Sequence, residues 1–159
     1  MPPEEAPRPI TDQMVCFTLY SAARATTQAY RSLLEPWGLT YPQYLVLVTL
    51  WVEGSLTVKE LGERMQLDSG TLSPLLARLE REGLVVRARS TADARVVQVR
   101  PTDRGAALQA EMDRVPAAVA RGLGLGDGVD GERLLATLHG VAASMHAVAD
   151  DPSSVLAPR

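Results

Sequence analysis

Cysteine and lysine are nearly absent from this sequence, and aromatic residues are few. Its 159 residues include a single cysteine, Cys16, which excludes an intrachain disulfide and any metal cage built from several cysteines. Aromatic residues make up only 4%, so leucine, valine and alanine must fill the core. Of the 16 basic residues only Lys59 is a lysine. The length is sufficient for one domain with a hydrophobic core.

Long hydrophobic runs are also missing. The longest, Tyr44 to Val52, is about half of the ~20 residues that a transmembrane helix needs. The N-terminal segment MPPEEAPRPI is acidic and proline-rich, without the apolar core of a secretory signal peptide. We therefore expect a cytoplasmic protein whose residues 1–10 form a disordered arm.

The net charge of −3 argues at first against a nucleic-acid partner, but the charges are unevenly distributed. Residues 57–104 contain nine basic and seven acidic side chains, whereas the rest of the chain contains seven basic and twelve acidic ones. Because DNA phosphates respond to local charge, the middle of the chain is the candidate nucleic-acid surface.

The first 53 residues contain two patterns that are compatible with helices. Apolar and small residues recur at helical spacing from Thr11 or Asp12, either of which is a suitable N-cap, to about Glu35. The next segment, Tyr41 to Glu53, is rich in β-branched and aromatic residues and is also compatible with a buried strand. Its length, and Pro42 near its start, favour a helix.

A helix-turn-helix pattern follows. Thr57 and Glu60 have the spacing of a capping box, which opens a short helix with the sequence TVKELGERM. After the turn QLDSG, Asp68 or Ser69 caps a second helix, Thr71 to Glu82, with a proline in its first turn. Two short helices joined by a tight turn, the second with outward polar residues, are what this motif requires.

A hairpin and two further helices are predicted after the second helix. LVVRARS and VVQVRP alternate apolar and basic residues around a polar turn at 91–94, which indicates a two-stranded wing. Thr102 then caps one long helix to about Gly122, GLGLGDGVDG forms a flexible connection, and residues 132–149 form a last helix. The predicted fold class is mostly α with a small β-wing, a winged helix-turn-helix dimerised through its N- and C-terminal helices.

The expected organisation of the chain follows from these elements. It comprises a disordered arm (1–10), an N-terminal helix for dimerisation and sensing (11–40), a DNA-binding region (41–104), C-terminal dimerisation helices (105–150) and a tail (151–159).

A winged helix-turn-helix contacts DNA through its second helix in the major groove and through its wing. The residues predicted to contact DNA from the second helix are Asp68, Ser69, Gly70, Thr71, Ser73, Pro74 and Arg78. Those predicted from the wing are Arg87, Arg89 and Arg95, of which Arg95 at the tip is suited to the minor groove. The alternative is that these arginines are solvated surface residues on an ordinary hairpin.

The motifs themselves resemble a known family. The stretch LTVKELGERMQLDSGTLSPLLARLEREGLVVR, followed by DARVVQVRPTDRG, resembles the MarR family over roughly residues 40–105. In that family an Asp-x-Arg pair in the wing orients the minor-groove arginine, and Asp93 and Arg95 match it. The N-terminal half, VCFTLYSAARATTQAYRSLLEPWGLTYPQYLVL, is more narrowly similar to the organic-hydroperoxide-sensing (OhrR) branch. The combined resemblance covers nearly all of residues 12–110.

Cys16 is the candidate redox-sensing residue. It lies about one turn into the first predicted helix, where free backbone N–H groups and the helix dipole favour a thiolate, which attacks a peroxide oxygen and becomes a sulfenic acid. Tyr20 lies four residues further on the same helix face. Tyr30 is ~21 Å from Cys16 along a straight helix and cannot reach it within one chain. Two such helices packed antiparallel across a two-fold axis bring Tyr30 to the cysteine of the partner subunit.

The OhrR resemblance implies this arrangement. There, tyrosines at the positions of Tyr30 and Tyr41 hydrogen-bond the reactive cysteine of the opposite subunit, and the one at Tyr20 lies nearby. Because this chain has no second cysteine, it resembles the one-cysteine type, and oxidised Cys16 must react with a low-molecular-weight thiol, form a sulfenamide or overoxidise. Without the resemblance, a lone cysteine is more often a small buried hydrophobic residue.

Together these features predict a non-enzymatic, peroxide-responsive repressor: a homodimer that binds a palindromic operator in double-stranded DNA and is released when an organic hydroperoxide oxidises Cys16. No cofactor or metal is expected, since His139 and His146 have no evident third ligand and GLGLGDG lacks the strand that precedes a dinucleotide loop. Three alternatives stay open: a MarR-type repressor that senses a non-covalent aromatic ligand, a thiol peroxidase that uses Cys16, and a winged helix that binds only protein.

Overall fold

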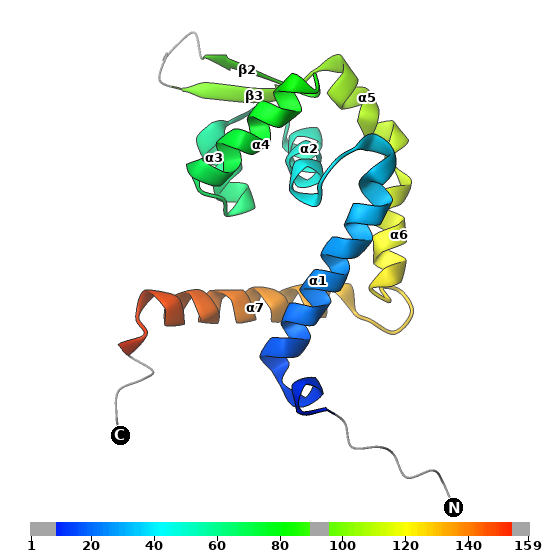
Figure 1. Cartoon of the computed structure of the whole chain (residues 1–159), viewed down its shortest axis with the longest axis vertical. Helices are drawn as coiled ribbons and strands as arrows, with labels where there is room; N and C mark the ends of the chain where they lie inside the picture. Colours follow the sequence, from blue (N-terminus) through cyan, green and yellow to red (C-terminus); the bar gives the residue numbers. More distant parts are fainter. Residues whose placement is uncertain (1–8, 90–95, 154–159) are drawn as a thin grey trace, which may run out of the picture. The chain divides into compact units, whose positions relative to one another are not determined.

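The computed structural model describes residues 9–89 and 96–153, which are mostly helical with one small sheet (Figure 1). Residue contacts divide the chain into two compact units, Met1–Asp113 and Arg114–Arg159. The wing residues Asp93 and Arg95, most of the predicted arm and most of the predicted tail lie outside the described residues. Among the helices that are described, none combines the length and the apolar character that crossing a membrane requires.

Helix α1 (Val15–Leu34) begins later than its sequence pattern predicted. A 3-10 turn, η1 (Ile10–Gln13), comes first, and the Met14 N–H donates to the Thr11 carbonyl three residues back (3.1 Å). Met14 then takes an extended backbone (φ −95°, ψ 112°), so it is Met14, and neither Thr11 nor Asp12, that occupies the N-cap. Within this fully described helix only Leu34 is buried.

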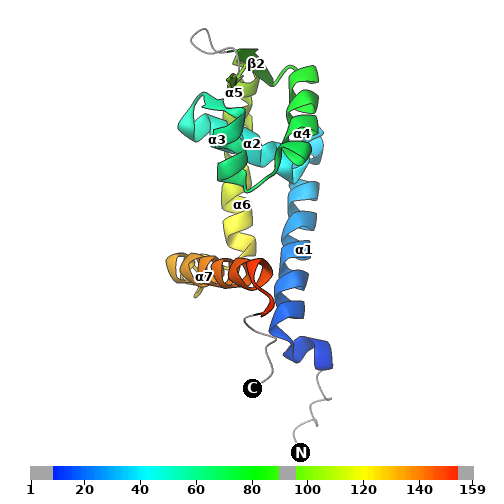
Figure 2. The ribbon, with the colours of Figure 1, turned by 90° about the vertical axis from the view of Figure 1, so that its left-hand side faces the viewer.

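Helix α2 (Tyr41–Glu53) shows that the strand alternative for this segment is wrong. A capping box opens it, in which the Thr40 backbone N–H donates to Gln43 Oε1 (2.8 Å), and Pro42 occupies the first turn. α2 packs against both helices of the helix-turn-helix and lies at the centre of the first unit (Figure 2). Its buried apolar side chains are Tyr44, Val46, Leu47 and Leu50.

Helices α3 (Val58–Met65) and α4 (Ser69–Arg81) form the predicted helix-turn-helix. The predicted capping box of α3 is present, because Thr57 Oγ accepts from the Glu60 N–H (3.1 Å) and Glu60 Oε2 accepts from the Thr57 N–H (2.8 Å). The turn between the helices passes through Gln66, whose φ of 53° lies in the left-handed region.

The start of α4 differs from the prediction by two residues. Asp68 is the N-cap, so Pro74 is the sixth residue of the helix and does not lie in its first turn. A proline at this position offers no N–H to the Gly70 carbonyl four residues earlier.

The wing belongs to a three-stranded antiparallel sheet with the order β1-β3-β2. Strands β2 (Val85–Arg89) and β3 (Val97–Pro101) are the predicted hairpin. The two-residue strand β1 (Leu56–Thr57), which the sequence pattern did not predict, pairs with β3 immediately before α3. The sheet therefore ties the wing to the first helix of the helix-turn-helix.

Thr102 caps α5 (Asp103–Glu111) as predicted, but the prediction of one helix to Gly122 is wrong. α5 ends at Glu111, and a separate helix, α6 (Arg114–Gly122), follows. Pro116 explains the interruption, because it has no N–H for the carbonyl four residues earlier and its ring clashes with that carbonyl in a continuous helix.

The second unit leaves apolar surface uncovered on α7 (Gly131–Asp150), which matches the last predicted helix. None of its residues, all of which are described, is buried. Its exposed large apolar side chains are Leu135, Leu138, Val141, Met145 and Val148. Such a row on a helix indicates a surface that another molecule covers.

Candidate nucleic-acid interface and thiol site

The exposed face of α4 carries the predicted major-groove residues. Leu72, Leu76 and Leu79 are buried on the opposite face and anchor the helix in the core of the first unit. The exposed residues include Ser69, Gly70, Thr71, Ser73, Pro74 and Arg78, all of them predicted, and also Arg81. Arg81 was not among the predicted residues, although its position three residues after Arg78 places it on the same helix face.

Asp68 orients the first turn of this helix. Its Oδ1 accepts from the Thr71 N–H (2.9 Å), and its Oδ2 accepts from Thr71 Oγ (3.2 Å). These hydrogen bonds stabilise the carboxylate and lower the pKa of Asp68. The carboxylate thus holds Thr71 in a fixed orientation at the exposed end of α4.

Two of the predicted arginines are paired with carboxylates. Arg78 Nε donates to Glu82 Oε1 one helical turn away (3.2 Å), and both side chains are partly exposed. A surface pair of this kind stabilises by only about 0–1 kcal/mol, so Arg78 is readily available to another anion.

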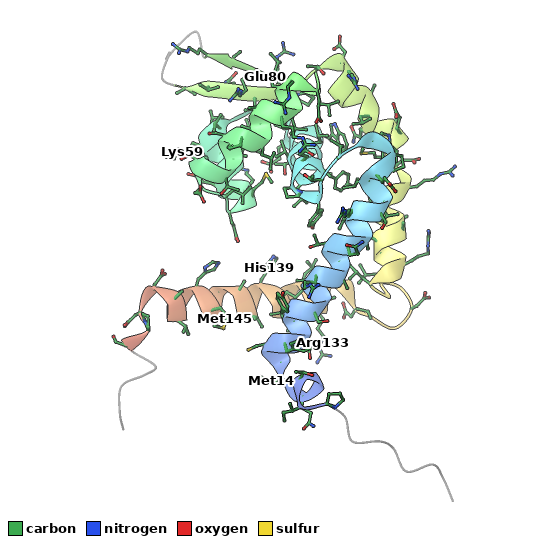
Figure 3. All side chains as sticks on the ribbon, in the orientation of Figure 1. Met14, Lys59, Glu80, Arg133, His139 and Met145 are labelled. Atoms are coloured by element: carbon green, nitrogen blue, oxygen red, sulfur yellow. The ribbon has the colours of Figure 1, made fainter. Side chains whose placement is uncertain are left out.

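Arg87 is held by α4 in a second, more extensive pair. Its Nε and Nη2 donate to Glu80 Oε2 (2.9 and 2.6 Å), and its backbone N–H donates to Glu80 Oε1 (3.3 Å). The bonds from Arg87 lower the pKa of Glu80. Glu80 lies on the part of α4 that adjoins the strands (Figure 3). Arg89, two residues further along β2, is exposed.

Sequence reasoning did not identify Glu80, although a signal was present. Val85 and Arg87 share one face of β2, because side chains alternate along a strand. Val85 is 2% exposed, so that face is turned toward the core. A charged side chain on such a face requires a partner, and Glu80 supplies it.

A groove of about 910 Å³ lies between the helix-turn-helix and the wing. It is lined by α3, α4 and the strands β2 and β3, with mostly apolar walls and Ser73 and Arg87 among its polar residues. Its size and walls are suited to a small organic molecule.

Cys16 is exposed as the second residue of α1 and is not buried in the core of its own chain. Tyr20, one turn further on, is 58% exposed. The guanidinium carbon of Arg24 lies 5.7 Å from the centre of the Tyr20 ring, a cation–π distance. The start of α1 thus presents a thiol, a phenol and a cation to its surroundings.

An aromatic cluster lies at the other end of α1. The rings of Tyr30 and Tyr41 stack with centroids 4.0 Å apart, and Tyr44, which was not predicted, lies 5.7 Å from Tyr30. Burial raises the pKa of Tyr30 to about 12, with smaller contributions from Tyr41 and Tyr44. The structure therefore brings Tyr30 and Tyr41 together, while Cys16 of the same chain lies at the opposite end of the helix.

Comparison with known proteins agrees with these features. The model of the MarR family matches residues 39–97. The organic hydroperoxide resistance transcriptional regulator of Bacillus subtilis is 40% identical over 135 residues, which are 85% of this chain and 91% of that protein. The transcriptional regulator TtmR of Methylorubrum extorquens is 55% identical over 108 residues, and these span 68% of this chain but only 55% of TtmR.

A solved structure shares the fold. Reduced AbfR bound to DNA has a TM-score of 0.71 at 29% identity, with 87% of this chain and 94% of that chain covered. AbfR comes from Staphylococcus epidermidis. The predicted fold class, a winged helix-turn-helix that is mostly α with a small β-wing, is therefore confirmed. The chain belongs to the MarR family of transcriptional regulators, within which it is similar to the organic hydroperoxide resistance regulator.

Proposed function

We propose that this regulator is a homodimeric repressor that binds a palindromic operator and is released when an organic hydroperoxide oxidises Cys16. The observation that carries the proposal is the stacked pair of Tyr30 and Tyr41 at one end of α1, with the exposed Cys16 at the other. An antiparallel pair of α1 helices brings each cysteine to the tyrosines of the partner subunit. The name of the Bacillus relative supports hydroperoxide as the signal.

Uncovered apolar surface supports the homodimer. α7 has no buried residue, and α1 exposes Val15, Phe17 and Leu19 near its start. Removing apolar surface from water stabilises an assembly by about 25 cal/mol per Å². A second copy of the chain offers the same two helices, so a two-fold axis can pair each of these surfaces with its own counterpart.

Operator recognition is assigned to α4 and the wing. The exposed residues of α4 from Ser69 to Arg78 enter the major groove, with Asp68 fixing the first turn. Arg89 contacts the phosphate backbone, and Arg95, oriented by Asp93 as the family resemblance implies, enters the minor groove. Half-sites about 10 bp apart match the two-fold symmetry of the dimer. A bacterial operator lies in the cytoplasm, which is therefore the proposed location.

Oxidation of Cys16 provides the switch. The thiolate attacks the distal peroxide oxygen, an S–O bond forms while the O–O bond breaks, and the alkoxide leaves as an alcohol after taking up a proton. A low-molecular-weight thiol then displaces hydroxide, which leaves as water, and forms a mixed disulfide. The hydrogen bonds from Tyr30 and Tyr41 to the thiolate are lost. A bulky substituent in the interface is suited to supply the ~5 kcal/mol that shifts the dimer from mostly bound to mostly free.

Fluorescence anisotropy with DNA from the chain's own promoter region tests this function. Cumene hydroperoxide should release the reduced wild type, a reducing agent should restore binding, and Cys16→Ser should stay bound. One equivalent of peroxide per chain should suffice, because the relatives are regulators. If reduced protein never binds, the repressor proposal fails. If peroxide is consumed catalytically over many turnovers, the thiol peroxidase alternative holds instead.

The groove between the helix-turn-helix and the wing favours a second candidate signal. Its apolar walls fit a small aromatic ligand that releases DNA without covalent chemistry. A Cys16→Ser protein that still responds fully to an aromatic inducer supports this second function, and one that responds to no inducer supports the peroxide switch.

A further inference from the structure

The wing is attached to α4 at two separate points. The first is the turn after the helix, where the Gly83 N–H donates to the Glu80 carbonyl (2.9 Å) and the Leu84 N–H donates to the Leu79 carbonyl (2.9 Å). This is the bonding pattern of a Schellman motif, with Gly83 at φ 71°. The second point lies three residues further along the chain, where Arg87 binds Glu80.

Three hydrogen bonds make the second attachment directional. Two come from the Arg87 guanidinium to Glu80 Oε2, and the third comes from the Arg87 backbone N–H to Glu80 Oε1. The bond from the backbone N–H holds the strand itself. The attachment therefore depends on the position of β2 and not only on a flexible side chain. Arg87 and Glu80 are about one-third exposed (33% and 36%), which shields the pair partly from water.

We propose that Glu80 and Arg87 form a positioning pair that fixes the angle of the wing against the recognition helix, and that Arg87 supports DNA binding through this pair and not by contacting a phosphate. The inference rests on the proposed operator binding and changes the role that the sequence pattern predicted for Arg87. The sheet already holds β2 through β3 and β1, and the pair adds a direct attachment of the strand to α4 beyond the Gly83 turn.

The geometry shows why the angle matters for DNA binding. Arg89 ends the strand five residues after Leu84, about 16 Å away at ~3.3 Å per residue. A tilt of about 10° at the turn moves that end by about 3 Å, as much as a whole hydrogen-bond length. Arg89 lies at this end, so the contact proposed for it with DNA depends on the pair.

The two roles of Arg87 predict opposite effects of neutralising Glu80. If Arg87 contacts a phosphate, Glu80→Gln frees its charge and removes a negative group near DNA, and affinity rises. If the pair positions the wing, the same substitution weakens the charge-assisted bonds and affinity falls. Glu82→Gln is the matched control, because Glu82 is a carboxylate on the same helix end that also pairs with an arginine.

The experiment measures operator and scrambled-duplex affinity by anisotropy, over a range of salt, for the reduced full-length protein. We expect Glu80→Gln and Arg87→Lys each to weaken operator binding about tenfold, because neither keeps all three charge-assisted hydrogen bonds between the two residues. We expect scrambled-duplex affinity to change less than about twofold, with an unchanged salt slope, because non-specific binding tolerates a shifted wing and Arg87 itself contacts no phosphate. Glu82→Gln should not weaken binding.

Two results overturn the proposal. Tighter operator binding by Glu80→Gln and wild-type affinity in Arg87→Lys each show that Arg87 acts on DNA directly or not at all. Melting curves establish that each variant is folded. If Glu80→Gln does not fold, Arg87→Lys still tests the proposal. If the wild type does not bind the operator, both the repressor function and this inference fail. If the wild type binds and the variants give one of the results above, only the inference about the pair fails.

Discussion

At the residue scale, Gly105 occupies the tightest position among the glycines that the structure describes. A Cβ atom at this position lies 1.9 Å from the Leu84 carbonyl oxygen at the start of the wing. The Gly105 carbonyl also accepts from Trp51 Nε1 (2.9 Å), so α5 has little freedom to withdraw. We predict that Gly105→Ala lowers the free energy of unfolding by more than about 3 kcal/mol, measured by urea denaturation. Ala106→Ser adds one atom at the exposed neighbouring residue and should change the free energy of unfolding by less than about 0.5 kcal/mol. If both variants lose a similar amount of stability, the close contact at Gly105 is not the cause.

The raised pKa of Tyr30 predicts that the folded chain loses stability at high pH. Burial raises its pKa to about 12 from the ordinary value of 10, so the folded chain holds the phenol proton more tightly than the unfolded chain. This contribution is fully present below pH 10 and is lost as the pH rises from 10 toward 12. Tyr30→Phe should therefore show a smaller fall in melting temperature over that range than the wild type. If the melting temperature of Tyr30→Phe falls as much as that of the wild type, ionisation of Tyr30 is not the cause.

At the scale of elements, Thr102 joins α5 to the turn that leaves α4. Its Oγ accepts from the Gly105 N–H (3.0 Å) and donates to the Gly83 carbonyl (2.6 Å). Thr102→Ala removes both bonds, and we predict a loss of about 1–2 kcal/mol in the free energy of unfolding. Thr102→Ser keeps the hydroxyl and should retain most of it. Chemical denaturation of the two variants checks this, and an equal loss in both shows that the methyl group is what matters.

Most helix boundaries could be predicted because the signals are local. The capping box of Thr57 and Glu60 and the caps at Asp68 and Thr102 are read within four residues of sequence. The signal for the break between α5 and α6 was equally local, since Pro116 marks it. The prediction overlooked it because apolar residues keep helical spacing on both sides. β1 has two residues, too few for a period to emerge.

Contacts between distant residues could not be predicted in the same way. The pairing of Glu80 with Arg87 depends on the direction in which the chain leaves α4, and the contact of Tyr44 with Tyr30 depends on how α2 packs against α1. Neither follows from spacing. Tyr30 and Tyr41 were identified together only because the sequence resembles a family in which the two act jointly.

At the scale of the whole molecule, the exposed row on α7 predicts dimerisation. Leu138 is 39% exposed within the row. We predict that Leu138→Glu shifts the protein toward monomer in sedimentation equilibrium, because a dimer buries the new charge without a partner. Ala143→Glu introduces the same side chain on the opposite face of the helix and should leave the dimer intact. If both variants shift the protein toward monomer equally, or if neither does, α7 does not form the interface.

The central claim is that the cysteine of one subunit works with the tyrosines of the other. One variant carries Tyr30→Phe and Tyr41→Phe but keeps Cys16, and a second carries Cys16→Ser with both tyrosines intact. Neither homodimer has a complete site, whereas a mixed dimer has one complete site if the site is shared between subunits.

The most direct measurement is therefore the rate at which cumene hydroperoxide consumes the Cys16 thiol in the two variants, alone and after mixing by unfolding and refolding together. The account predicts slow reaction in the Phe variant alone and a fast phase, at the wild-type rate, in the mixture. A mixture that reacts no faster than the Phe variant alone contradicts it and places the site of Cys16 within a single subunit or away from the tyrosines.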